Sequence, residues 1–208
     1  MVDVSGMIYN ANRPKLLSVG ENPVSLLHEK LEMAAKDRTV MAVILRINSP
    51  GGTVTATDAM YRQVMRFKRK TGKPVLALMM DVAASGGYYL ACSADAIMAY
   101  PTTVTGSIGV LVQTVSLKPA LSRIGIQAET FTSGPNKDAG SLFSTLTNEH
   151  RTVLQQLVND FYKQFVDVVR QQRGGISEDH FETVTDGRVL SGAQALEMGL
   201  VDEIGDLY

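Results

Sequence analysis

Two nearly continuous apolar runs constrain the fold of this chain more than any other feature. The first covers residues 40–47 and is rich in branched side chains, and the second covers residues 75–80. Apolar runs of this kind are typical of strands that are covered on both faces, as in parallel sheets. We therefore expect two buried strands that belong to one largely parallel sheet.

Segments with a helical spacing of apolar residues alternate with strand-like segments along the rest of the chain. Helices are predicted over residues 24–36, 55–70, 117–124, 147–173 and 191–198, with a further helix after Ser85. Further strands are predicted over residues 2–9, 96–99, 106–112, 126–131 and 200–204. This alternation indicates an α/β protein with mostly parallel pairing. Because no linker or internal repeat divides residues 1–208, one domain is predicted.

The composition excludes several classes of protein. The 208 residues are 45% hydrophobic and 20% charged, as in ordinary soluble domains, and the net charge of −1 offers no electrostatic case for binding nucleic acid. The single cysteine, Cys92, rules out an internal disulfide and is expected to be buried. The three histidines are too far apart to form a metal motif, so no metal is expected. No apolar run reaches the roughly 20 residues that a membrane-spanning helix needs.

A serine follows the second apolar run at a predicted strand-to-helix corner. The chain leaves the strand at Asp81, passes through small residues to Ser85, and enters an apolar helical segment through Gly86 and Gly87. Unpaired N–H groups at a helix N-terminus favour developing negative charge, which suits a nucleophile. The alternative is that Ser85 only caps the helix, since serine is a common N-cap residue.

Glycines follow both apolar runs, at residues 51–52 and 86–87. In open α/β sheets, sites form beyond the carboxyl ends of the strands, so both segments can face one cleft. The backbone N–H of Gly51 or Gly52, together with that of Gly86, could then form an oxyanion hole. The alternative is that the first glycine pair is simply a turn.

A serine nucleophile needs a general base. The first histidine after Ser85 is His150, which stands early in a polar helix and is expected to be exposed. Lysine can replace histidine in Ser-Lys enzymes. Two lysines lie between these residues: Lys118 at the start of a predicted surface helix, and Lys137 in the polar, glycine-containing loop 133–141.

A lysine base must be neutral near pH 7. Its pKa must fall from about 10.4 to about 7–8, which corresponds to about 4 kcal/mol and requires burial or a nearby cation. For Lys137, the loop would have to pack into a cleft or against another subunit, and Asp138 would oppose the change if its carboxylate pointed at the lysine. The residue types alone leave Lys137 open as a surface lysine or a base.

Five motifs occur in the order found in one peptidase family. They are Arg46–Gly52, Ala83–Tyr89, Thr105–Val110, Ser133–Asp138 and Asp186–Val189, and the closing segment 195–202 also fits. The chain therefore resembles the S49 serine peptidases, the family of signal peptide peptidase A, from about Val40 to Gly205.

This resemblance implies a Clp/crotonase-like α/β fold with a mostly parallel sheet and flanking helices, and a Ser-Lys dyad. The family's nucleophile falls on Ser85 and its general base on Lys137. A helper hydroxyl that orients the lysine falls on Ser107, and the backbone oxyanion donors fall on Gly52 and Gly86. No metal or cofactor is expected for this chemistry.

The resemblance also implies substrates and partners. The expected reaction is hydrolysis of hydrophobic peptides, such as cleaved signal peptides, through an acyl-enzyme. The resemblance implies ring-shaped assemblies with active sites between subunits. We therefore expect a homo-oligomer in which Lys137 can serve the Ser85 of a neighbouring subunit. Full-length members often carry an N-terminal membrane anchor, and some carry two copies of the domain. Membrane association is expected only if the full-length protein carries an anchor outside this chain. Without such an anchor, a soluble protein is expected.

Three other functions remain open at this stage. A phage-type capsid-maturation peptidase of the same family would share the dyad and differ in substrate. A crotonase-type acyl-CoA enzyme would share the oxyanion hole but would use an acidic residue and would not need Ser85. A non-catalytic assembly module would keep the fold without turnover.

Overall fold

Two compact units make up the chain in the computed structural model, which describes residues 1–12, 14–15 and 18–206. The first unit contains residues 1–109 and 164–208, and the second contains residues 110–163. Each unit is described by itself below. The single domain over residues 1–208 stays a prediction.

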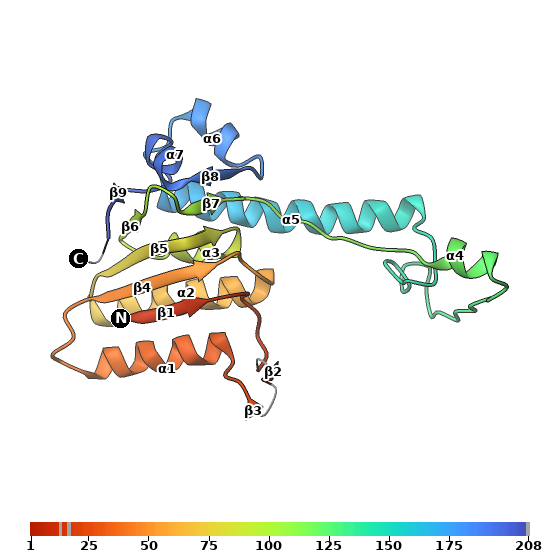
Figure 1. Ribbon diagram of the computed structural model, residues 1–208, viewed down its shortest axis with the longest axis horizontal. Helices are drawn as coiled ribbons and strands as arrows, with labels where there is room; N and C mark the ends of the chain where they lie inside the picture. Colours follow the sequence, from red (N-terminus) through yellow and green to blue (C-terminus); the bar gives the residue numbers. More distant parts are fainter. Residues whose placement is uncertain (13, 16–17, 207–208) are drawn as a thin grey trace. The chain divides into compact units, whose positions relative to one another are not determined.

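A largely parallel sheet forms the centre of the first unit (Figure 1). Its strands are β1 (Val2–Ser5), β4 (Val43–Ser49), β5 (Val75–Ala84), β6 (Ala96–Ala99), β7 (Val104–Gly106), β8 (Val189–Ser191) and β9 (Glu203–Ile204). The order β1-β4-β5-β6-β9 is parallel throughout, and only β8, which pairs with β7, is antiparallel. A separate antiparallel pair joins β2 (Pro14–Lys15) to β3 (Ser18–Val19). The predicted α/β class with mostly parallel pairing is confirmed.

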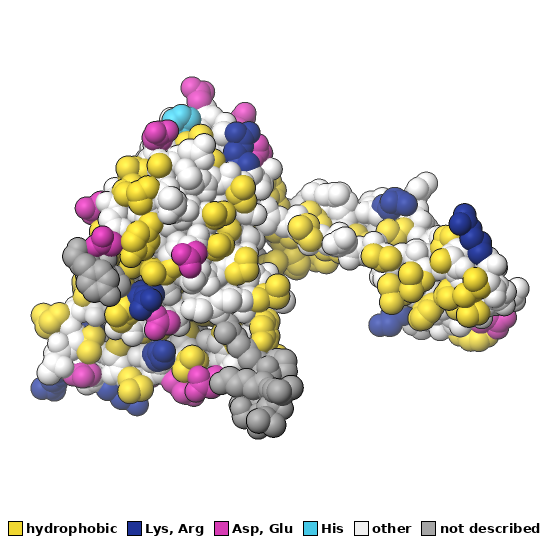
Figure 2. All heavy atoms as spheres, in the orientation of Figure 1, with side chains coloured by type: hydrophobic (Ala, Val, Ile, Leu, Met, Phe, Trp, Pro, Cys, Tyr) yellow, Lys and Arg dark blue, Asp and Glu magenta, His cyan; other side chains and the backbone are white. Residues whose placement is uncertain are grey.

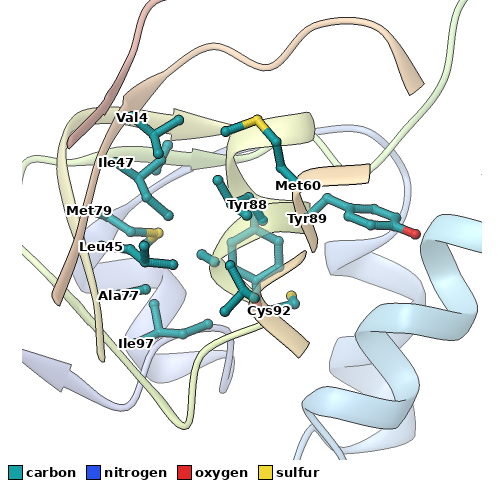
Figure 3. Close-up of a cluster of buried hydrophobic side chains, with 14 of the residues drawn as sticks. Val4, Leu45, Ile47, Met60, Ala77, Met79, Tyr88, Tyr89, Cys92 and Ile97 are labelled. Carbon is teal, nitrogen blue, oxygen red and sulfur yellow. The ribbon is translucent and has the colours of Figure 1, made fainter. Parts of the chain in front are cut away.

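Helices flank this sheet and bury its apolar side chains. They are α1 (Pro23–Lys36), α2 (Val54–Thr71), α3 (Gly86–Ala91), α6 (Glu178–Val184), α7 (Gly192–Glu197) and the end of α5 (Asn148–Gln172). Figure 3 shows side chains of β1, β4, β5 and β6 facing Met60 of α2, Tyr88 of α3 and Cys92, which directly follows α3. Cys92 is buried as predicted, and this burial raises the pKa of its thiol to about 12, which leaves the thiol unreactive.

The strand β5 is longer than predicted and changes its neighbour along its length. Residues 76–79 pair with β6, and residues 82–84 pair with β7. On the other side, the register with β4 shifts between Ile47 and Ser49. Asn48 fills this irregularity, because its Oδ1 accepts the Val82 N–H at 3.1 Å and its Nδ2 donates to Asp81 at 3.1 Å. The extra length carries the end of β5 to the glycine segment that follows β4.

The second unit contains α4 (Lys118–Arg123) and the first part of α5. Two strands predicted here are wrong: residues 107–112 and 126–131 form no strand, and β7 covers only Val104–Gly106. A strand needs a neighbour for its backbone groups, and neither segment has one within the described part of the chain. Apolar side chains of these segments remain exposed, with Leu111 at 81% and Phe131 at 91%.

Near the C-terminus the sequence pattern missed two elements, α6 and β8, and overestimated the last strand. Arg173, just after α5, closes this region by donating to the Gly199 carbonyl and to both carboxylate oxygens of Asp202 at 2.8 and 2.9 Å. Of the helices that the structure describes, none combines the length and the apolar character needed to cross a membrane.

Candidate active site

Ser85 occupies a strained corner between β5 and α3. Its φ of 51° and ψ of −120° lie outside the regions that non-glycine residues normally adopt. The backbone on either side fixes this conformation, since the Ser85 N–H donates to the Gly106 carbonyl at 2.9 Å and the Ser85 carbonyl accepts from the Tyr89 N–H at 2.9 Å. The Ser85 hydroxyl makes no capping hydrogen bond to α3. The interpretation of Ser85 as a simple helix cap is therefore wrong, and its half-buried hydroxyl is available for other contacts.

Ser107 lies beside this corner at the end of the neighbouring strand. Ala84 of β5 pairs with Gly106 of β7, so Ser85 and Ser107 follow paired positions. Among the described residues, these two serines are the only non-glycine residues with positive φ, and both have a φ of 51°. The Ser107 N–H donates to the Arg188 carbonyl at 2.6 Å. Backbone strain of this kind concentrates at functional sites.

The glycines after β4 pack directly against the serine corner. A Cβ on Gly51 would lie 2.7 Å from the Gly86 nitrogen, and a Cβ on Gly86 would lie 3.2 Å from the Gly52 nitrogen. Only glycines allow the two segments to approach so closely. The residue pattern left Gly51 and Gly52 open as the first donor, and the family resemblance assigned it to Gly52. In the structure the Gly51 N–H donates to Ser49 Oγ at 3.1 Å, so among the described contacts Gly52 is the glycine with an unpaired N–H.

These two N–H groups suit an oxyanion hole because neither has a partner among the described contacts, although Gly86 itself is buried. Gly52 is exposed, although its backbone is fixed by a bridge to Ile8, whose carbonyl accepts the Thr53 N–H at 2.8 Å. The Gly86 N–H belongs to the first residue of α3 and has no partner within that helix. Both donors therefore stand free beside Ser85 in the described part of the chain, at the carboxyl ends of β4 and β5.

Sequence reasoning assigned no role to Ser49 or Thr57. Ser49 is fully buried, and its hydroxyl orients the glycine pair by accepting the Gly51 N–H. The sequence carried a signal for the burial of Ser49, because this residue continues the alternating buried positions of β4. The earlier positions of this series are Val43, Leu45 and Ile47. The buried Thr57 hydroxyl has no hydrogen-bond partner among the described residues, and its oxygen would lie 2.6 Å from a Cβ on Gly86.

Lys137, the predicted base, lies in the second unit. It is exposed, and its N–H donates to the Gly134 carbonyl at 3.2 Å in a turn of the loop 133–141. His150 was expected to be exposed on α5, and this prediction is wrong: only 3% of its surface is exposed. The cause is the loop itself, because Pro135 places its carbonyl oxygen 2.7 Å from His150 Nε2.

No group of three or more His, Cys, Asp or Glu side chains that could hold a metal ion occurs among the residues whose positions are described. The buried polar contacts near the site are instead hydrogen bonds around the hydroxyl of Tyr89. Tyr89 of α3 donates to Asp58 of α2 at 2.9 Å, and Gln164 of α5 donates to the Tyr89 hydroxyl at 3.2 Å. Burial raises the pKa of Tyr89, and Asp58 adds to the effect, so the tyrosine remains a neutral link between three helices.

A serine on a strained strand-to-helix turn, at the carboxyl edge of a parallel sheet and beside free backbone N–H groups, is the arrangement of α/β serine hydrolases. This defines the class of protein. Comparison with known proteins narrows the class to one family.

The model of peptidase family S49 matches residues 67–208, a range that includes Ser85, Ser107 and Lys137. A candidate protease of Synechocystis sp. is 34% identical over 204 residues, which are 98% of this chain and 68% of that protein. A candidate signal peptide peptidase SppA of Enterococcus faecium is 32% identical over 204 residues, 98% of this chain and 59% of that protein. The chloroplastic serine protease SPPA of Arabidopsis thaliana is 37% identical over 182 residues, 87% of this chain and 26% of that protein.

The chain belongs to peptidase family S49, a membership that makes it a serine peptidase. The observed parallel sheet with flanking helices is consistent with the Clp/crotonase-like fold that the sequence motifs implied. The chain spans from about a quarter to about two thirds of the length of these three relatives.

Proposed function

We propose that this protein hydrolyses peptide bonds with Ser85 as nucleophile and Lys137 as general base. The observation that carries the proposal is the strained Ser85 corner, where a hydroxyl without a capping bond lies beside the Gly52 and Gly86 N–H groups, which have no partner in the described part of the chain. Such donors stabilise the oxyanion of a tetrahedral intermediate, and strain at the serine fixes its direction of attack.

In the proposed reaction, neutral Lys137 takes the proton from Ser85 Oγ as this oxygen attacks the substrate carbonyl. Ser107 orients the lysine through its hydroxyl, and the Gly52 and Gly86 N–H groups bind the oxyanion. The lysine then gives its proton to the leaving amine, and water hydrolyses the acyl-enzyme. These steps need no metal or cofactor.

The proposed substrates are hydrophobic peptides, such as cleaved signal peptides, bound in an extended conformation. The name of the Enterococcus relative, a candidate signal peptide peptidase, supports this class of substrate. Attachment of the full-length protein to a membrane, through a segment outside this chain, belongs to the same proposal.

Covalent labelling tests the nucleophile directly. A fluorophosphonate probe is expected to modify the wild-type protein once, at Ser85, because its phosphorus takes the place of the substrate carbonyl. Peptide mapping by mass spectrometry identifies the modified residue. Modification elsewhere, or none in a protein that is folded and assembled, would count against a peptidase and favour an acyl-CoA enzyme or a non-catalytic module.

We further propose that the active protein is a homo-oligomer in which Lys137 of one subunit serves Ser85 of another. A lysine base has to be buried or placed near a cation, and Lys137 is exposed in the single chain. The second unit also exposes many large apolar side chains, and Figure 2 shows the hydrophobic side chains on one face of the molecule. They are Leu111, Val112, Val115, Leu117, Ile124, Ile126, Phe131, Leu142, Phe143, Val153 and Leu157. An apolar surface of this kind is typical of an interface.

Mixed oligomers test the sharing of active sites. Inactive Ser85→Ala and Lys137→Ala proteins are expected to regain part of the wild-type activity when they are dissociated and assembled together. Recovery arises because a mixed assembly pairs an intact Ser85 with an intact Lys137. Native mass spectrometry verifies that both variants are in one assembly, and verified mixed oligomers without activity would reject sharing between subunits.

A further inference from the structure

The turn that precedes β8 is closed by a single carboxylate. Asp186 accepts the Arg188 backbone N–H at 2.9 Å, and its two oxygens also accept Nε of the same arginine at 2.9 Å and Nη2 at 2.6 Å. Gly187 between them has a φ of 91°, a conformation that glycine adopts without strain. One side chain thus holds both the backbone and the guanidinium of Arg188. We call residues 186–188 the Asp-Arg clasp.

The carbonyl of Arg188 reaches the end of β7. Arg188 directly precedes β8, so it lies beyond the last pair of the ladder between these strands, which joins Gly106 to Val189. Its carbonyl accepts the Ser107 N–H at 2.6 Å. A Cβ on Gly106 would lie 2.9 Å from this carbonyl oxygen, so a glycine is needed for the close approach. The position of the carbonyl therefore depends on the clasp as well as on the ladder.

The peptide group between Gly106 and Ser107 extends this contact to Ser85. Its N–H is the group donated to Arg188, and its carbonyl oxygen accepts the Ser85 N–H at 2.9 Å. One planar peptide unit therefore carries a hydrogen bond at each end. Hydrogen bonds linked in this way strengthen one another. A shift of the Arg188 carbonyl is thereby passed to the backbone of Ser85.

The conformations along this chain of bonds need support. Ser85 and Ser107 each have a φ of 51°, and strained residues persist only where the surrounding structure fixes them. The side chains of Asp186 and Arg188 are 43% and 48% exposed, so their charges alone attract only weakly. The bond to the Arg188 backbone adds to this attraction. Hydrogen bonds from Arg188 also lower the pKa of Asp186, so the carboxylate stays charged at neutral pH.

We propose that Asp186 and Arg188 are positioning residues for the nucleophile. Their clasp fixes the peptide group between Gly106 and Ser107, and this peptide group holds the Ser85 backbone in the conformation from which its hydroxyl attacks. This inference rests on the proposed role of Ser85 as nucleophile and is independent of which residue is the base.

The test is the second-order rate at which a fluorophosphonate labels Ser85 in the assembled protein. This rate reports the direction of the hydroxyl without a bound peptide. Asp186→Ala and Arg188→Ala are each expected to slow labelling by about tenfold and to lower kcat for a fluorogenic peptide by a similar factor, with KM unchanged. A displacement of 1 Å costs about a hundredfold, and an open clasp allows a smaller one.

Two further variants define the clasp. Asp186→Asn keeps an oxygen that can accept the Arg188 N–H and is expected to stay within about threefold of wild type. The double variant Asp186→Ala/Arg188→Ala is expected to be no slower than either single variant, because each substitution opens the same clasp. Arg188→Ala keeps the carboxylate bond to the backbone and so retains the test if Asp186→Ala fails to fold.

Glu178→Ala is the matched control, because it opens another exposed ion pair, with Arg170 at 3.0 Å. It should label at the wild-type rate. The proposal is overturned if Asp186→Ala and Arg188→Ala also label at that rate, or if KM rises while kcat is unchanged. Equal slowing in Glu178→Ala would overturn it too, as would a double variant slower by about a hundredfold, since two independent residues give that product.

Labelling of the wild-type protein separates this result from a failure of the proposed function. If the assembled wild type is not labelled at Ser85, this residue is not the nucleophile and both proposals fall. If the wild type is labelled at Ser85 and the clasp variants match its rate, only the role of the clasp is rejected.

Discussion

Alanine at Ser85 or at Lys137 is expected to abolish peptide hydrolysis, with kcat lower by at least about 10⁴-fold in either variant. Ser85→Ala removes the attacking oxygen, and Lys137→Ala removes the group that accepts its proton. The measurement is steady-state cleavage of a fluorogenic hydrophobic peptide at a fixed concentration of assembled protein.

The double variant Ser85→Ala/Lys137→Ala sharpens this test. Groups that act as one unit are not additive, so the double variant is expected to be no less active than either single variant. Ser122→Ala and Lys118→Ala change an exposed serine and an exposed lysine of α4 and should leave kcat unchanged. Substantial activity in Lys137→Ala, together with loss in Lys118→Ala, would move the base to Lys118.

Elements with a strong local pattern could be predicted from the sequence. The helix predicted over residues 55–70 is α2 (Val54–Thr71), and the longest predicted helix, over residues 147–173, is α5 (Asn148–Gln172). Their apolar residues repeat at the helical period and their ends carry local signals, such as Gly72 in the left-handed conformation after α2. The central strands were predictable from their apolar runs, although side chains of β4 alternate between buried and half-buried positions.

Strands that depend on partners could not be predicted in the same way. Residues 107–112 and 126–131 have strand-like composition, but the described chain offers them no neighbour. β8 was missed for the opposite reason, because its three residues become a strand only by pairing with β7. Pairing is a property of the fold, and a local pattern does not contain it.

In the candidate site, too, features with a local sequence pattern could be predicted and features that depend on the fold could not. The serine at a strand-to-helix corner was visible in the sequence, whereas the positive φ shared by Ser85 and Ser107 was not. The residue pattern did not distinguish Gly52 from Gly51 without the family resemblance, since the difference depends on the hydroxyl of Ser49. The burial of His150 was hidden because the residue that covers it, Pro135, stands 15 positions earlier in the chain.

Gly86→Ala is expected to lower kcat by about a hundredfold while the sheet remains folded. The new Cβ would lie 2.6 Å from Thr57 Oγ1 and 3.2 Å from both Gly51 Cα and the Gly52 nitrogen. The start of α3 must then move away from the glycine pair. This movement spreads the two N–H groups that are proposed to bind the oxyanion, and a displacement near 1 Å is enough for such a loss.

The Thr57 hydroxyl provides a matched rescue, because its oxygen is the atom nearest to the new Cβ and has no hydrogen-bond partner among the residues that the structure describes. Thr57→Ala/Gly86→Ala is expected to recover much of the lost kcat, and Thr57→Ala alone should be close to wild type. Gly72→Ala, where nothing lies within 4 Å, controls for a glycine substitution as such; its φ of 68° costs about 1 kcal/mol of stability with kcat unchanged. Wild-type kcat in Gly86→Ala would remove the Gly86 N–H from the oxyanion hole, whereas loss without rescue would place the damage elsewhere in α3.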